Sequence, residues 1–192
     1  SNIEQRLAVA IGKQRYESSR KSGVHNAKMG GQGNDETDRE GAAAEIAFCK
    51  LFNCYPDLSI EIKSAENGTD KGDAIIGGKA IDVKSTKYAT GRLLATMKKK
   101  NNKSVYAYAL LTGTMPNYIF RGFMKREELL SDDMIGDLGH GRGYMAEQNK
   151  LLEWEDLEKS NDHEGLEQDS LIGQNELLSY QGNQRNQQQI NP

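Results

Sequence analysis

The feature that most constrains this chain is a pair of short apolar segments joined by two glycines, within residues 69–87 (TDKGDAIIGGKAIDVKSTK). A Gly-Gly pair suits a two-residue β-hairpin turn, because both central residues can adopt positive φ without strain. With Gly77-Gly78 as the turn, the predicted cross-strand partners are Ile76 with Lys79, Ile75 with Ala80, Ala74 with Ile81, and Asp73 with Asp82.

The two aspartates at the open end of this hairpin are the first candidate functional residues. Side chains directly opposite each other across a ladder lie about 5 Å apart, and like charges there are destabilising. A divalent cation bound between Asp73 and Asp82 would relieve that repulsion. Lys84 is two residues beyond Asp82 and shares its face of the sheet, whereas Ile81 and Val83 point toward a core.

Charge is distributed unevenly along the 192 residues, whose net charge is -3. Residues 155–192 hold eight acidic and two basic residues, which leaves 20 acidic and 23 basic residues before them. Residues 79–103 hold eight basic residues and one acidic residue. A basic region beside two carboxylates suits a polyanionic substrate that is also held through a metal ion. A solvated basic face is the alternative, and it is preferred for the lysine run 98–100 taken alone.

Several classes of protein are disfavoured by the sequence. No apolar run approaches the length of a membrane span, and the first residues lack the basic-then-apolar layout of a secretory signal. Cys49 and Cys54 fit neither a disulfide framework nor a zinc site, which needs more ligands. We therefore expect a cytoplasmic protein with two reduced thiols and no membrane partner.

The pattern of apolar residues predicts a mixture of helices and strands. A helix is expected over residues 2–22, and a second begins near Thr37, where Thr37 and Glu40 form a capping-box pattern, and continues to about residue 53. Glu45 lies at the edge of the buried stripe of this second helix. Strands are predicted over residues 58–63, 104–113 and 117–124, in addition to the hairpin.

The remaining segments are less regular. We expect a short helix or ordered loop over residues 88–103, a short helix over 125–134, a glycine-rich loop over 136–144 and a last helix over 147–159. The predicted domains are an N-terminal helix and flexible linker (1–37), a core (38–159) and an acidic, Gln/Asn-rich tail (160–192) that is disordered or bound to a partner.

Three motifs, in this order, resemble the PD-(D/E)XK nuclease superfamily, which includes type II restriction enzymes, archaeal Holliday junction resolvases and phage exonucleases. They are GAAAE in the second helix (ending at Glu45), Gly72-Asp73, and IDVK (ending at Lys84). The D-x-K motif stands where many members have E-x-K, and Gly72 stands where many have proline. By element order the resemblance covers residues 38–125. It implies an α/β (α+β) restriction-endonuclease-like core, with a central mixed sheet of about four to five strands flanked by helices.

The chemistry of the candidate residues fits hydrolysis of a phosphodiester. Mg²⁺ prefers hard oxygen ligands and supplies both charge stabilisation and a deprotonated water, and Mn²⁺ is expected to substitute for it. Asp73 and Asp82 are the predicted ligands, and Lys84 is placed to stabilise the phosphate and orient the water. The resemblance adds the backbone carbonyl of Val83 as a ligand, and Glu45 as the ligand of a second metal ion or of a metal-bound water.

The predicted activity is that of a Mg²⁺-dependent deoxyribonuclease, either an endonuclease or an exonuclease, of the kind used in phage or mobile-element DNA processing. It would act in the cytoplasm of the cell, or of the host if a phage encodes it. A homodimer, or a protein partner bound through the acidic tail, is left open. DNA phosphates are expected to contact a set of basic residues: Lys87, Arg92, Lys98, Lys99, Lys100, Lys103 and Arg142.

Two other interpretations compete with a nuclease. One is a non-catalytic module on the same fold that binds nucleic acid or protein, which the acidic tail and the negative net charge favour. The other is an unrelated α+β interaction domain, in which the Asp and Lys residues form salt bridges.

Overall fold

A computed structural model of the chain describes residues 1–23, 33–61, 71–139 and 141–159. The chain divides into two units, Ser1–Leu152 and Glu153–Pro192. The described part of the second unit includes a helical run over 154–159, and the predicted acidic tail lies outside the described residues. In the described part of the chain, no helix has the length and apolar character needed to cross a membrane. The elements named below belong to the first unit.

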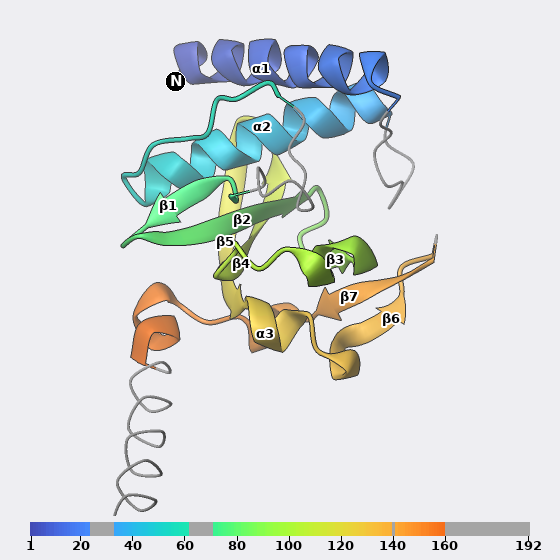
Figure 1. The fold of residues 1–192 in the computed structure, drawn as a ribbon. Helices are drawn as coiled ribbons and strands as arrows, with labels where there is room; N and C mark the ends of the chain where they lie inside the picture. Colours follow the sequence, from blue (N-terminus) through green and yellow to red (C-terminus); the bar gives the residue numbers. More distant parts are fainter. Residues whose placement is uncertain (24–32, 62–70, 140, 160–192) are drawn as a thin grey trace, which may run out of the picture. The chain divides into compact units, whose positions relative to one another are not determined.

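The first helix, α1 (Asn2–Lys21), confirms the helix predicted over residues 2–22. It packs along α2 (Asn34–Leu51), which lies between α1 and a four-stranded sheet (Figure 1). The two helices approach closely at Gly12, where a Cβ atom would lie 2.5 Å from the Cα of Arg39. A side chain at position 12 would therefore push the helices apart.

The start of α2 differs from the prediction, because the helix begins at Asn34 and the predicted capping box is wrong. Thr37 lies inside the helix, where its hydroxyl donates to the carbonyl of Gly33 at 3.0 Å. The carboxylate of Glu40 instead accepts a hydrogen bond from the Tyr118 hydroxyl at 2.7 Å and one from the Met115 amide at 3.1 Å. Glu40 therefore ties α2 to a turn of the sheet.

Four strands form a mixed sheet in the order β1-β2-β4-β5. β2 and β4 run parallel, and the β1–β2 and β4–β5 pairs are antiparallel. The two long strands predicted around Met115-Pro116 are confirmed. The strands are β1 (Ala74–Ile76), β2 (Lys79–Thr86), β4 (Ala107–Thr114) and β5 (Asn117–Lys125).

The Gly77-Gly78 hairpin has the predicted register over three residue pairs, from Ile76 with Lys79 to Ala74 with Ile81. Both glycines have positive φ, 55° and 80°, which is the conformation that this turn requires. The ladder ends at Ala74, so the fourth predicted pair, Asp73 with Asp82, is not part of it.

A second, smaller sheet was not predicted. It is antiparallel with the order β3-β7-β6, from β3 (Leu93–Thr96), β6 (Ile135–Asp137) and β7 (Arg142–Ala146). Residues expected to form a helix or ordered loop over 88–103 thus include a strand, which is followed by the 3₁₀ helix η1 (Met97–Asn101). Strands β6 and β7 replace most of the predicted glycine-rich loop.

Three other predicted elements differ from those in the structure. The strand predicted over residues 58–63 is absent from 58–61, and residues 62–63 lie outside the described part of the chain. The helix predicted over 125–134 is confirmed in part, as α3 (Arg126–Leu129) and a 3₁₀ turn at Asp132–Met134. The helix predicted over 147–159 is interrupted, with a 3₁₀ turn at Gln148–Lys150 and the helical run over 154–159.

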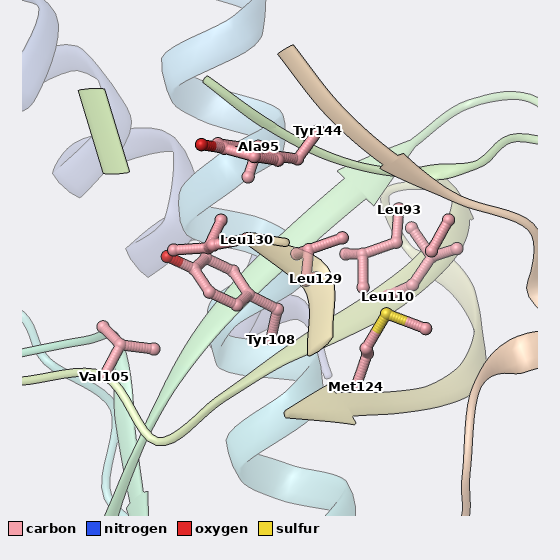
Figure 2. Close-up of a cluster of buried hydrophobic side chains, with 10 residues drawn as sticks. Leu93, Ala95, Val105, Tyr108, Leu110, Met124, Leu129, Leu130 and Tyr144 are labelled. Carbon is pink, nitrogen blue, oxygen red and sulfur yellow. The ribbon is translucent and has the colours of Figure 1, made fainter. Parts of the chain in front are cut away.

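The two faces of the four-stranded sheet belong to different cores. Phe123 of β5 packs against Phe48 of α2, with ring centroids 5.9 Å apart. Met124 follows Phe123 on β5, and its partner on β4 is Tyr108. Both side chains face the opposite side of the sheet and join a cluster with residues of the smaller sheet and α3 (Figure 2). Asp82 is aligned with Tyr108 in the β2–β4 pairing, so its side chain shares the face of this second cluster.

Candidate active site

Asp73 immediately precedes β1, where the antiparallel ladder ends. Its amide donates to the carbonyl of Ile81 at 2.8 Å, although Ile81 is already the partner of Ala74. The chain therefore leaves the regular ladder at Asp73, and the Asp73 side chain does not take the position opposite Asp82. The carboxylate of Asp73 accepts a hydrogen bond from the Val83 amide at 2.8 Å. Asp73 therefore lies beside the backbone of the D-x-K segment rather than directly across from Asp82.

Gly72 allows the backbone before Asp73 to approach β2 closely. It has a φ of +82°, and a Cβ atom built on it would lie 2.8 Å from the carbonyl oxygen of Ile81. Both the backbone conformation and the close approach to β2 disfavour a side chain at this position. The G-D dipeptide is therefore a structural requirement for placing Asp73.

Asp82 lies between two lysines and is almost completely buried, with 2% of its surface exposed. Lys84, two residues further along β2, contacts one carboxylate oxygen, and Lys99 of η1 lies 2.8 Å from the other. Burial alone would raise the pKa of Asp82, but the charges of Lys84 and Lys99 outweigh it and hold the pKa below its usual value. Asp82 is therefore an ionised, buried carboxylate shared by two ammonium groups.

Glu45 of α2 is held by Arg15 of α1. Both carboxylate oxygens of Glu45 accept hydrogen bonds from Nη1 of Arg15, at 2.9 Å and 2.7 Å. The same guanidinium donates to the carbonyls of Asp57 and Ser59, at 2.7 Å and 3.0 Å. One partly buried arginine therefore fixes Glu45 and the segment that leads from α2 toward the hairpin.

The acidic residues near Arg15 also shift the pKa values of Arg15 and of the Cys49 thiol. Burial lowers the pKa of Arg15, but the charges of Glu45, Asp73 and Asp57 raise it by more. Burial, a contact with Cys54, and the charges of Glu45 and Asp73 raise the pKa of the Cys49 thiol. Glu45 and Asp73 thus share one electrostatic environment at the α2 side of the sheet, whereas Asp82 belongs to the other side.

The charged residues form two groups on opposite sides of the sheet. The first consists of Arg15, Glu45 and Asp73, and the second of Asp82, Lys84 and Lys99. Among the described residues, no group of three or more His, Cys, Asp and Glu side chains is arranged to hold a metal ion. Mg²⁺ retains several waters and is often bound through only one or two carboxylates, but Asp73 and Asp82 lie on opposite sides of the sheet, so the structure does not assemble the predicted pair of ligands.

The basic residues predicted to contact DNA differ in their surroundings. Arg92 pairs with Glu147 at 2.6 Å, and Lys100 pairs with Asp132 at 3.1 Å. The ammonium group of Lys87 lies 5.6 Å from the ring centre of Tyr88. Three more of these residues are exposed: Lys98, Lys103 and Arg142. Lys99 differs from the rest because its ammonium group faces the buried Asp82.

The contacts of Arg15 and Lys99 were not predicted from the sequence. Arg15 is one of several cationic residues on a helix, and its spacing does not distinguish it from Arg6 or Lys13. What distinguishes it is burial, since its side chain is 18% exposed and that of Lys13 is 75% exposed. Lys99 was expected to contact phosphate, because its place in a lysine run gives no sign of a buried partner.

Comparisons of this chain with protein-family models, with curated proteins and with solved structures find no match.

Proposed function

We propose that this chain is a metal-dependent nuclease that hydrolyses phosphodiester bonds of DNA. The observation that best supports this proposal is the hydrogen bond from the Val83 amide to the Asp73 carboxylate, because it brings Asp73 to the D-x-K segment of β2. The Asp73 carboxylate then lies next to the strand that carries Asp82 and Lys84.

Asp73 and Asp82, with the carbonyl of Val83, are the proposed ligands of the ion, and binding one ion between them requires their side chains to be redirected to one side of the sheet. When bound, Mg²⁺ would supply charge stabilisation at the phosphate and an activated water. Lys84 has the role of an ammonium group beside the reacting phosphate, where its charge stabilises the negative charge that develops. Its contact with Asp82 keeps this ammonium group at the site in the absence of substrate.

Among the proposed site residues, Glu45 is the one least available to a metal ion. Its carboxylate is already occupied by Arg15, so a role in binding a second metal ion or a metal-bound water requires Arg15 to release it. The arrangement supports a positioning role more readily, because Arg15 and Glu45 hold the segment before Asp73.

The same charge pairs favour a second candidate, a binding module that holds DNA or a protein without cutting it. Glu45 and Asp82 each have a basic side chain of the same chain as their partner, as in a site whose acids serve only the fold. This candidate predicts DNA binding that falls with added salt, since counterion release dominates such affinity, but no metal-dependent cleavage.

Incubation of the protein with linear, circular, single-stranded and branched DNA, with and without Mg²⁺ or Mn²⁺, tests the proposal. Cleavage that depends on the metal ion is expected, and it should be abolished in Asp82→Ala and Lys84→Ala variants that remain folded. An exposed acid and lysine on α1, Glu17 and Lys13, provide matched controls whose substitution should leave the rate unchanged. Cleavage at the wild-type rate by either site variant would refute the assignment.

A further inference from the structure

The β2–β3 loop (residues 87–92) presents an aromatic side chain to solvent. Tyr88 is 64% exposed, and Lys87 and Arg92 of the same loop are exposed as well. Single exposed apolar side chains are common on protein surfaces and need no function. Tyr88 differs from such residues in how firmly its loop is held and in the charges around its ring.

The backbone of the β2–β3 loop is fixed by several hydrogen bonds. The amide of Gly91 donates to the carbonyl of Tyr88 at 2.9 Å. The side-chain amide of Gln148 donates to the carbonyls of Ala89 and Gly91, at 2.8 Å and 2.7 Å. Arg121 of β5 also donates to the carbonyl of Ala89, at 3.4 Å. A tyrosine ring on a fixed loop loses little conformational entropy when it binds a flat ligand.

Positive charge lies beside the exposed ring. The ammonium group of Lys87 is 5.6 Å from the centre of the Tyr88 ring. Arg92, at the other end of the loop, pairs with Glu147 at 2.6 Å, so Lys87 is the cation of the loop that is nearer the ring and better placed to bind an anion. The loop directly follows β2, the strand that carries Lys84 of the proposed site. An aromatic ring next to a cation is the combination that binds single-stranded nucleic acid, through base stacking and phosphate contact.

From this geometry we infer that Tyr88 stacks on an unpaired base of DNA while Lys87 binds an adjacent phosphate. In a duplex the bases stack on one another, whereas an unpaired base presents its face to a side chain. The inference rests on the DNA binding of the proposed function and deepens it, because it names single-stranded DNA as the preferred ligand of this loop. Neither residue needs a metal ion for this role.

The test measures binding of a labelled single strand and of the matching duplex by fluorescence anisotropy, with EDTA present to prevent cleavage. Tyr88→Ala should weaken binding of the single strand about tenfold, because it removes one base–aromatic stack. It should change binding of the duplex by less than about twofold. Tyr88→Phe keeps the ring and should bind both DNAs as the wild type does. Lys87→Ala should weaken both and make the salt dependence of binding less steep.

Two controls separate stacking from other effects. An oligomer built from an abasic nucleotide analogue has phosphates but no bases, so the wild type and Tyr88→Ala should bind it equally. Tyr55 is 85% exposed and has no basic residue near it among residues 53–58. Tyr55→Ala should therefore bind each DNA as the wild type does.

Equal affinities of the wild type and Tyr88→Ala for the single strand would overturn the inference and leave the proposed function unaffected. An equal loss of affinity for the abasic oligomer would overturn it too, because Tyr88 would then act only by shaping the loop. A wild-type chain that binds single strands through Tyr88 but cleaves no DNA with Mg²⁺ or Mn²⁺ would overturn the proposed nuclease and leave the inference standing. A wild-type chain that binds no DNA would overturn both.

Discussion

The carboxylate of Asp73 accepts a hydrogen bond from the backbone amide of Val83 at 2.8 Å, although Asp73 lies outside the β1–β2 ladder. Like charges on directly opposite residues would destabilise a hairpin that contains no cation. The hydrogen bond from the Asp73 amide to the Ile81 carbonyl takes the chain out of the ladder before that pairing and leaves Asp73 beside the strand that carries Asp82. The site therefore folds without requiring a metal ion to separate its acids.

Gly72 is predicted to be essential for placing Asp73. Gly72→Ala adds a side chain at a φ of +82° and 2.8 Å from a backbone oxygen of Ile81, so we expect a loss of about 3 kcal/mol of unfolding free energy. Gly78→Ala is the matched control, because Gly78 has a φ of +80° and open space around its Cα. It should cost about 1 kcal/mol, the strain of the backbone conformation alone.

Urea unfolding of the two glycine variants measures this difference. Equal losses would show that the close approach of Gly72 to Ile81 contributes nothing, and that the hairpin tolerates a wider separation of its strands. Under the proposed function, Gly72→Ala should also reduce cleavage by more than Gly78→Ala, because only the former displaces Asp73.

The stability of the protein should fall in acid because of Asp82. Its pKa in the folded state is below the ordinary value of an aspartate, about 3.9, so folding favours the ionised form. This contribution is fully present above about pH 5 and is lost as the pH falls through the ordinary value toward the lower folded-state pKa. Asp82→Asn removes it and should flatten the dependence of unfolding free energy on pH in that interval.

The measurement is a set of urea midpoints between about pH 7 and pH 3 for the wild type and Asp82→Asn, and the difference between the two curves is the relevant quantity. Glu4 contributes to the acid slope of both proteins, since contacts with the Ser1 amino group and Lys50 lower its pKa to about 2. Parallel curves for the wild type and Asp82→Asn would contradict the prediction.

The contact between α2 and the β4–β5 turn gives a third prediction. Tyr118→Phe removes a hydroxyl that donates to the Glu40 carboxylate at 2.7 Å, and should cost about 1.5 kcal/mol, as for other hydrogen bonds to charged groups. Tyr55→Phe is the control, because Tyr55 is 85% exposed. Thermal or urea unfolding of both variants measures the loss of stability. Equal stabilities of Tyr118→Phe and Tyr55→Phe would show that the amide of Met115 alone satisfies Glu40.

Local sequence patterns predicted the parts of the fold that local interactions determine. The register of the Gly77-Gly78 hairpin follows from the turn, and the β4–β5 hairpin follows from alternation around Met115-Pro116. The smaller sheet was missed because its strands are short and one of them, β3, pairs with a distant segment. Leu93 is the partner of Ala146, and nothing in the basic sequence between residues 88 and 103 indicates that pairing.

The candidate site was predicted as a set of residue types but not as a set of contacts. Asp82 and Lys84 lie on one face because strands alternate, and this required only the sequence. The position of Asp73 depends on how Gly72 approaches Ile81, and the pairing of Asp82 with Lys99 depends on where η1 packs. Neither is visible in the spacing of residues along the chain.

Arg15 is predicted to be the residue of α1 that contributes most to the candidate site. Arg15→Ala leaves the buried Glu45 carboxylate and the carbonyls of Asp57 and Ser59 without their donor, and we expect a loss of about 2–4 kcal/mol of unfolding free energy. Arg15→Lys should restore little of this, because a single ammonium group cannot reproduce the planar fork of a guanidinium group.

A double-mutant cycle with Glu45→Ala separates the ion pair from the contacts of Arg15 with the two carbonyls. We expect a coupling of about 1 kcal/mol or more between Arg15 and Glu45, since the two side chains are only 18% and 12% exposed. Arg6→Ala, at an exposed position of the same helix, should change stability by less than about 0.5 kcal/mol. A coupling near zero would mean that Arg15 acts through the backbone of residues 57–59 and not through Glu45.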